Sequence, residues 1–196
     1  MQIFSVNNLS FKAKFPISNC HILDKKQNNF VEATVFEHDC KDLFDAYEVQ
    51  KTDKDFAFRD LFLSGMHKKF INNKIGLNTT GHYYTLQKKD GEILGLCHTT
   101  EDKDIEVALL SSRKFGNYKY VGQNILSALA QKTMEQNKEE LKVGCVLEEA
   151  EDFYEKACGF EKRLNGVIEP YYTFHLSKEN IPNFIEKVKK KTNYLA

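Results

Sequence analysis

Three short segments in the middle of the chain, joined by tight turns, constrain the fold more than any other feature of the sequence. Residues Tyr83 to Gln87, Ile93 to Thr100 and Ile105 to Leu110 contain many β-branched and aromatic side chains, as strands do. Asp90-Gly91 is a hairpin signal, and residues 101–104 form a second short turn. Because loops this short force neighbouring strands to run antiparallel, the sequence predicts an antiparallel meander.

A long amphipathic helix is expected directly after this meander, because apolar side chains recur at helical spacing from Val121 to about Gln136. The strand that follows it should return to the sheet in parallel, since a helix intervenes. The other expected elements are a strand over 30–36, two helices starting near Asp39 and Asp53, a strand over 141–147, a helix over 150–158, strands over 162–167 and 171–176, and a C-terminal helix over 184–191.

Composition excludes several classes of protein. A chain of 196 residues fits one domain. The 28 basic and 28 acidic residues cancel, so no global field favours nucleic acid or an anionic membrane. Apolar runs are far shorter than the roughly 20 residues of a membrane span. Residues 1–14 lack a signal-peptide core, and we therefore expect a cytoplasmic protein.

The cysteines favour neither a metal site nor disulfides. There are five, an odd number, without CxxC spacing, which is typical of reduced thiols in a cytoplasmic chain. Cys97 and His98 are adjacent on a predicted strand, so their side chains should point to opposite faces and not chelate together. We predict no metal.

Residues 150–161, AEDFYEKACGFE, resemble a motif of the Gcn5-related N-acetyltransferase (GNAT) family, A-x-x-F-Y-E-K-x-G-F. Here Tyr154 and Gly159 are separated by one residue more than in the usual pattern. The predicted order β-α-α-β-β-β-α-β-α-β-β also resembles that of the family. A second similarity covers Ile105 to Leu129, the family's fourth strand, pyrophosphate loop and long helix. The usual loop Q/R-x-x-G-x-G/A falls on residues 117–122, where only Gly122 agrees.

The resemblance implies an α/β fold with a mixed, mostly antiparallel sheet of about seven strands and four flanking helices. The fourth and fifth strands would splay apart, and a C-terminal helix over 178–196 and an extension over 1–29 would be additions to a single domain of 196 residues. It also implies that acetyl-CoA binds to the backbone of the fourth strand, with a bulge near Ser111, and to the pyrophosphate loop. The implied donor-binding residues are Leu109, Leu110, Ser111, Ser112, Asn117, Tyr118, Lys119, Tyr120, Val121, Gly122 and Gln123.

A helix start with free amides can hold a pyrophosphate mainly through its backbone. Tyr120 can present its N–H if its φ angle is negative, although it obstructs approach more than a glycine would. Arg113, Lys114 and Lys119 either screen the phosphate charge or are ordinary solvated cations.

By its motif position, Tyr154 is the candidate general acid for the departing CoA sulfur; the alternative is a tyrosine that only packs at a helix start. Glu106 is the candidate base for the amine, on a face shared with Ala108 and Leu110, or else a surface residue of a strand. Glu148 and Glu149 could attract a cationic acceptor, but acidic residues are also favoured in the first turn of a helix by its dipole.

The sequence therefore predicts an N-acetyltransferase that moves an acetyl group from acetyl-CoA to a primary amine, small or peptidic, by direct attack in a ternary complex. One alternative is a binding or regulatory module that keeps the fold without turnover. Another is an acyltransferase that uses a longer acyl-CoA or an acyl-carrier protein. The oligomeric state, monomer or homodimer, stays open.

Overall fold

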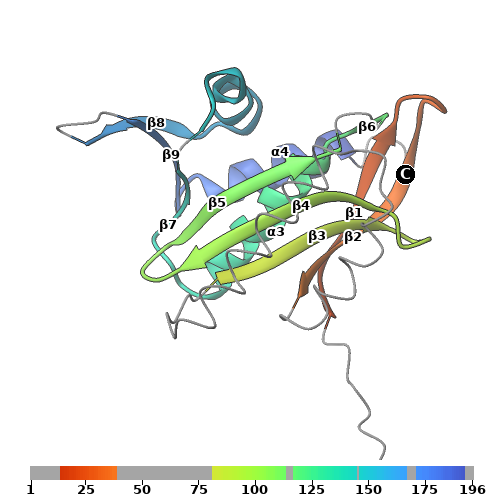
Figure 1. Cartoon of the computed structure of the whole chain (residues 1–196), viewed down its shortest axis with the longest axis horizontal. Helices are drawn as coiled ribbons and strands as arrows, with labels where there is room; N and C mark the ends of the chain where they lie inside the picture. The colour runs from red at the N-terminus through yellow and green to blue at the C-terminus, as the bar shows by residue number, and fades with distance from the viewer. Residues whose placement is uncertain (1–13, 39–80, 114–116, 145, 167–170, 193–196) are drawn as a thin grey trace, which may run out of the picture.

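The computed structural model describes residues 14–38, 81–113, 117–144, 146–166 and 171–192. The helices expected near Asp39 and Asp53 lie outside these residues. The described strands form one sheet of nine, in the order β6-β1-β2-β3-β4-β5-β7-β9-β8. Helices α3 and α4 lie behind strands β3 to β5 in the view of Figure 1.

The elements have the following bounds. The strands are β1 Lys14–Asp24, β2 Asn29–His38, β3 Gly81–Lys88, β4 Ile93–Glu101, β5 Ile105–Ser112, β6 Tyr118–Lys119, β7 Glu140–Val143, β8 Glu161–Asn165 and β9 Tyr171–Ser177. The helices are α3 Val121–Glu135 and α4 Ile181–Thr192, with a 3₁₀ turn η1 over Glu148–Ala150 and a π-helical turn η2 over Phe153–Cys158.

The predicted meander is confirmed, because β3, β4 and β5 pair antiparallel in sequence order. The parallel return is also confirmed: β7 pairs in parallel with β5. The expected mixed and mostly antiparallel sheet is therefore correct, whereas its strand number is nine instead of about seven.

The two additional strands are β1 and β6. β1 forms a hairpin with β2 across a turn in which the Asp24 carboxylate accepts hydrogen bonds from the amides of Lys26 (2.8 Å) and Gln27 (3.3 Å). Asn28 completes this turn in a left-handed conformation, φ 51°, which asparagine adopts more readily than most residues. β6 pairs only with the end of β1, at Leu23 and Asp24.

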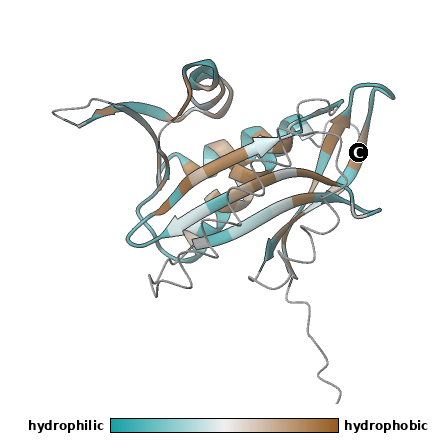
Figure 2. Ribbon diagram, in the orientation of Figure 1, coloured by the Kyte–Doolittle hydropathy of each residue, from teal (hydrophilic) through white to brown (hydrophobic). Residues whose placement is uncertain are grey.

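The core lies between the sheet and the two helices. On α3, the side chains of Ile125, Leu126 and Leu129 are fully buried in this core. Gly95 of β4 lets α3 approach closely, because a Cβ there would lie 2.6 Å from Cγ1 of Val121. Figure 2 shows apolar stretches of α3 behind strands β4 and β5, which are themselves apolar over part of their length. None of the helices in the described ranges is long and apolar enough to span a membrane.

Neighbouring residues of β4 serve opposite faces of the sheet, as predicted for Cys97 and His98. Cys97 is fully buried in the core on the α3 side. His98 stacks on Tyr83 with a ring separation of 4.5 Å, and Tyr83 is not part of that core cluster.

Candidate functional site

Strands β5 and β7 part soon after they begin to pair. Their parallel ladder covers Ile105–Val107 and Leu141–Val143 only, and the last hydrogen bond runs from the amide of Gly144 to the carbonyl of Val107 at 3.4 Å. β5 continues to Ser112. From residue 108 onward its edge on this side therefore has no strand partner within the described ranges. The expected splay between these two strands is present.

β7 is shorter than predicted. The sequence predicts a strand over 141–147, but β7 ends at Val143, where its pairing with both β5 and β9 also ends. Cys145, expected inside this strand, lies outside the described residues.

A β-bulge in β5 lies at Ala108. His98 pairs with Leu109, whereas Thr99 pairs with Val107, so Ala108 is the extra residue. The expectation of a bulge near Ser111 is wrong by three positions. A bulge bends its strand and inverts the alternation of faces beyond it, and here it coincides with the point at which β5 leaves β7.

The bulge also changes which residues share a face with Glu106. Glu106 pairs with Thr100, and Leu109 with His98, so these residues lie on the sheet face that points away from α3. Leu110 lies on the other face, where its Cδ2 atom approaches Gly122 of α3. The prediction that Glu106 and Leu110 share a face is therefore wrong.

Glu106 lies where the two strands separate. Its side chain is exposed, and its Oε1 atom is 2.8 Å from the position that a Cβ on Gly144 would occupy. Gly144 is the first residue after β7, and because it has no side chain the carboxylate of Glu106 has space beside it.

Tyr154 is on a π-helical turn, and this turn accounts for the additional residue in its motif. Residues Phe153–Cys158 form η2, in which hydrogen bonds span one residue more than in an α-helix. The amide of Phe160 donates to the carbonyl of Tyr154 at 2.9 Å, and Gly159 closes the turn with φ 78°. Because the wider turn takes up the insertion locally, the helix expected over 150–158 is present as η1 followed by η2.

The ring of Tyr154 is 6% exposed. It lies between Phe153, Phe160 and Phe174, at ring separations of 5.0, 5.9 and 5.5 Å. Burial raises the pKa of its phenol, and the nearby thiol of Cys97 raises it further. The phenol is therefore protonated at neutral pH, and it lies on the α3 side of the sheet, opposite to Glu106.

The first turn of α3 has no capping side chain, which leaves the amides of Val121, Gly122 and Gln123 for another partner. The residue before them, Tyr120, has φ 71°. The negative φ that would let Tyr120 present its N–H is thus not adopted. A left-handed conformation in a residue other than glycine costs roughly 1–2 kcal/mol, and it occurs here at a position where the family motif has glycine.

The β1–β2 hairpin holds this turn in place. The amide of Lys25 donates to the carbonyl of Asn117 at 2.6 Å, and Tyr118 and Lys119 pair with β1. The ring of Tyr120 stacks on Phe30 of β2 at 6.4 Å. The unpredicted strand β1 therefore positions the loop that the sequence singled out.

Gly122 lies under the ring of Phe153. A Cβ at Gly122 would lie 3.1 Å from Cζ of Phe153 and 3.7 Å from Cδ2 of Leu110. The start of α3, the outer half of β5 and η2 thus meet at one point. Sequence reasoning did not single out Phe153, although it precedes Tyr154 in the motif.

The other charged candidates are more dispersed. Arg113 is anchored to the start of β4, where its amide donates to the carbonyl of Leu94 at 3.1 Å and its guanidinium to that of Ile93. Lys119 is exposed on β6, and Lys114 lies outside the described residues. Phosphate screening by Lys119 and Lys114 stays a prediction.

The acidic residues just before Tyr154 divide into those that make ion pairs and those that do not. Glu151 pairs with Lys162 at 2.7 Å, and Asp152 with Lys156 at 2.9 Å. Glu148 and Glu149 are exposed on η1, and neither makes an ion pair with a described residue. Within the described ranges, no group of three or more His, Cys, Asp or Glu side chains is arranged to hold a metal ion.

A further ionisable group, which sequence reasoning missed, surrounds Lys132 near the opposite end of α3. Its Nζ atom donates to Glu37 (3.1 Å), Glu101 (2.8 Å) and the hydroxyl of Tyr84 (2.6 Å). Hydrogen bonds from His82 and from Lys132 lower the pKa of Glu37 to about 2. These contacts tie the end of α3 to three strands.

No protein-family model matches the chain, and no curated protein matches it in sequence. Solved structures do resemble it. The spermidine N-acetyltransferase of Vibrio cholerae, in complex with CoA and spermine, superposes with a TM-score of 0.52 at 12% identity, over 77% of this chain and 98% of that one. A protein of Desulfovibrio desulfuricans assigned to the GNAT family of acetyltransferases gives 0.51 at 11% identity, over 74% of this chain and 99% of that one. The chain therefore has the fold of the GNAT acetyltransferases.

Proposed function

We propose that this protein is an N-acetyltransferase that moves an acetyl group from acetyl-CoA to a primary amine in a ternary complex. The observation that carries this proposal is the free edge of β5 beyond Val107, next to the uncapped first turn of α3. Both features offer backbone hydrogen-bonding groups to an extended, anionic ligand.

The donor would lie along that edge. The backbone of Leu109–Ser112 would pair with the amides of the pantetheine arm as an added strand does. The amides of Val121, Gly122 and Gln123, at the positive end of the α3 dipole, would hold the pyrophosphate. Residues 117–120 would shape this loop, because β1 fixes their position.

The two side chains proposed to take part in the reaction, Glu106 and Tyr154, lie on opposite faces of the sheet. The amine nitrogen first loses the proton of its ammonium form to solvent. It then attacks the thioester carbonyl and forms a tetrahedral intermediate, and one of its remaining protons passes to Glu106, directly or through one water. Collapse of the intermediate breaks the C–S bond and releases the CoA thiolate. Glu106 would thus act from the face away from α3, and Tyr154 from the α3 side.

The role of Tyr154 follows from its burial. In water a phenol is a weaker acid than a thiol, with pKa values of about 10 and 8.5, and burial raises the pKa of both groups. Complete proton transfer from the phenol to the thiolate is therefore uphill. The phenol would stabilise the departing sulfur chiefly by donating a hydrogen bond to it, and solvent would complete the protonation.

The acceptor would be a cationic amine or polyamine. Glu148 and Glu149 carry unpaired negative charge just before Tyr154, which would attract such a substrate. The Vibrio cholerae structure contains spermine, so polyamines are the first acceptors to test.

One set of contacts favours the alternative of a binding module without turnover. Phe153 and Leu110 pack against Gly122, and Tyr120 takes the place of a glycine beside it. If these side chains do not move aside, the pyrophosphate cannot reach the amides of the first turn.

Calorimetric titration with acetyl-CoA, followed by a thiol-release assay with an amine panel, tests the proposal. Tyr154→Phe should reduce kcat roughly 10²-fold with little change in acetyl-CoA affinity. Tyr172→Phe is the matched control, because Tyr172 is a half-exposed tyrosine of β9. Binding without release of CoA by any amine would support the module. Unchanged turnover in Tyr154→Phe would remove this residue from the mechanism.

A further inference from the structure

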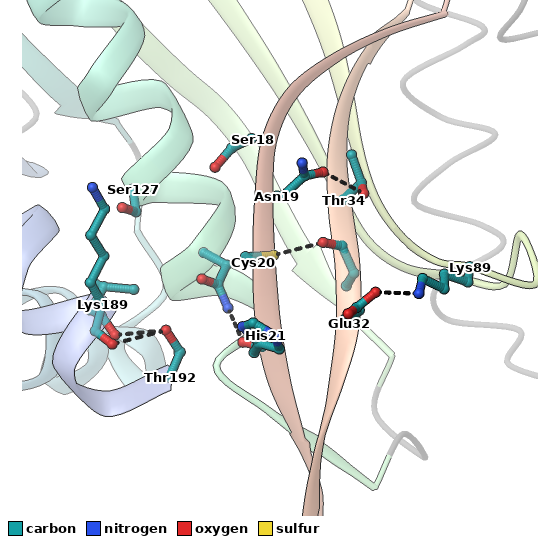
Figure 3. A pocket seen from close by; sticks show the side chains of 13 residues that line it. Ser18, Asn19, Cys20, His21, Glu32, Thr34, Lys89, Ser127, Lys189 and Thr192 are labelled. Carbon is teal, nitrogen blue, oxygen red and sulfur yellow. Dashed lines mark hydrogen bonds and ion pairs between the residues drawn. The ribbon is translucent and has the colours of Figure 1, made fainter. Parts of the chain in front are cut away.

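A cavity of about 490 Å³ lies between β1, α3 and the end of α4. Figure 3 shows Ser127, Lys189 and Thr192 on its helical side, and Ser18 and Cys20 on its strand side. Its volume is within the range of small-molecule sites. β1 and α4 belong to the two segments, 1–29 and 178–196, that the sequence resemblance left unassigned.

The cavity is separate from the free edge of β5. The residues of α3 that line it are Asn124 and Ser127, whereas Gly122 contacts β5 and η2. At about 100° per residue these positions lie on opposite flanks of the helix. A ligand in the cavity would therefore have α3 between itself and the proposed donor site.

Asn124 leaves one hydrogen-bond acceptor free at the wall of the cavity. Its side chain is 4% exposed, and its Nδ2 group donates to the carbonyls of His21 (2.9 Å) and Tyr120 (3.0 Å). Two carbonyl partners fix the orientation of the amide, because Oδ1 would repel both of them. No described residue donates to Oδ1. This atom is not among the fully buried polar atoms that lack a partner, so it remains open to a donor from a ligand or from water at the cavity wall.

The charge of the lining is positive. Lys189 lines the cavity and makes no ion pair with any described residue, whereas the neighbouring Lys190 pairs with Glu186. On the strand side, Glu32 and Lys89 neutralise each other. One cation thus remains, on the helical side of the cavity that Ser127 also lines.

We propose that this cavity binds a small organic anion, a carboxylate or a phosphate, that also carries a hydroxyl or amino group. Lys189 and Ser127 would bind the anionic oxygens, and Oδ1 of Asn124 would accept a hydrogen bond from the second group. Burial raises the pKa of the Cys20 thiol to about 12, so the site is suited to binding and not to nucleophilic chemistry. The proposal does not depend on acetyl transfer.

Titration of the full chain with malate and with glycerol 3-phosphate, followed by calorimetry, tests the site and distinguishes carboxylate from phosphate. At least one probe should bind saturably. Lys189→Met should weaken this binding about tenfold, the loss expected for one charged hydrogen bond. Lys190→Met is the matched control and should change it less than about twofold, because the Lys190 side chain pairs away from the cavity.

Three results would overturn the proposal. The first is no saturable binding of either probe below about 10 mM. The second is equal weakening by the two lysine variants, which would indicate general attraction to the basic end of α4. The third is displacement of the probe by acetyl-CoA, which would make the cavity part of the donor site. Because Lys189 is exposed, the thermal midpoint of the unliganded Lys189→Met variant should stay close to that of the wild type.

Discussion

Gly95→Ala tests how closely α3 is held against the sheet. A Cβ at Gly95 would lie 2.6 Å from Cγ1 of Val121 and 2.7 Å from Cδ1 of Ile125. Carbon atoms in ordinary contact are roughly 3.5–4.0 Å apart, so the helix would have to retreat by about 1 Å. The two side chains have no room to turn away, because they are 5% and 0% exposed.

The expected loss of stability is about 2 kcal/mol. Overpacking of a core by one methyl group typically costs about 1–3 kcal/mol. Replacement of glycine by alanine restricts the unfolded chain, which offsets about 0.4–1 kcal/mol of this. Because Val121 begins α3, the same retreat should displace the first-turn amides and weaken acetyl-CoA binding.

Urea unfolding followed by circular dichroism measures the effect. Ile125→Val removes the Cδ1 atom and alone should cost about 0.5–1.5 kcal/mol. In the Gly95→Ala background it should cost less, since it also relieves the clash, and the double-mutant cycle reports this coupling. A Gly95→Ala protein as stable as the wild type, or more stable, would refute the close approach of α3 to β4.

Substitutions at three other positions test separate features of the structure. Gly144→Ala should lower turnover with little loss of stability, because the new Cβ would contact only the flexible end of the Glu106 side chain. Unchanged turnover, or a large loss of stability, would contradict this. Between pH 6 and pH 3 the free energy of unfolding should fall by about 2 kcal/mol less in Glu37→Gln than in the wild type. The reason is that the Glu37 carboxylate, with a pKa of about 2, stays charged in the folded state, whereas in the unfolded chain it takes up a proton. Equal pH dependence in urea titrations would exclude this. Tyr120→Gly should be more stable than Tyr120→Ala by about 1 kcal/mol, since both lose the stack on Phe30 and only glycine relieves the positive φ; the reverse order would contradict the left-handed turn.

Short-range patterns were sufficient for most of the elements. Turn residues such as Asp90-Gly91 and the apolar stripe of α3 determine local structure, and both were predicted correctly. β1 was missed because its apolar residues are interrupted by Pro16 and by polar residues. β1 is a strand because it pairs with β2. Local sequence patterns do not reveal this pairing unless the hairpin turn at Asn28 is recognised.

The site was harder to predict, for geometric reasons. The alternation of residue types did not predict the bulge at Ala108. A bulge changes only which face the residues after it occupy, and the residue types around Ala108 do not mark where this change begins. The insertion in the Tyr154 motif was visible, but sequence alone did not show that a π-helical turn would take it up. The sign of φ at Tyr120 depends on pairing with β1, which was not expected.

The central claim is that the free edge of β5 and the first turn of α3 bind acetyl-CoA through their amides. Two-dimensional amide NMR of the labelled full chain, titrated with acetyl-CoA, measures this directly. We expect the largest shift changes at Leu109–Ser112 and Val121–Gln123, with little change on the β8–β9 hairpin. Saturable binding that leaves these amides unshifted, or no binding at all, would contradict the claim.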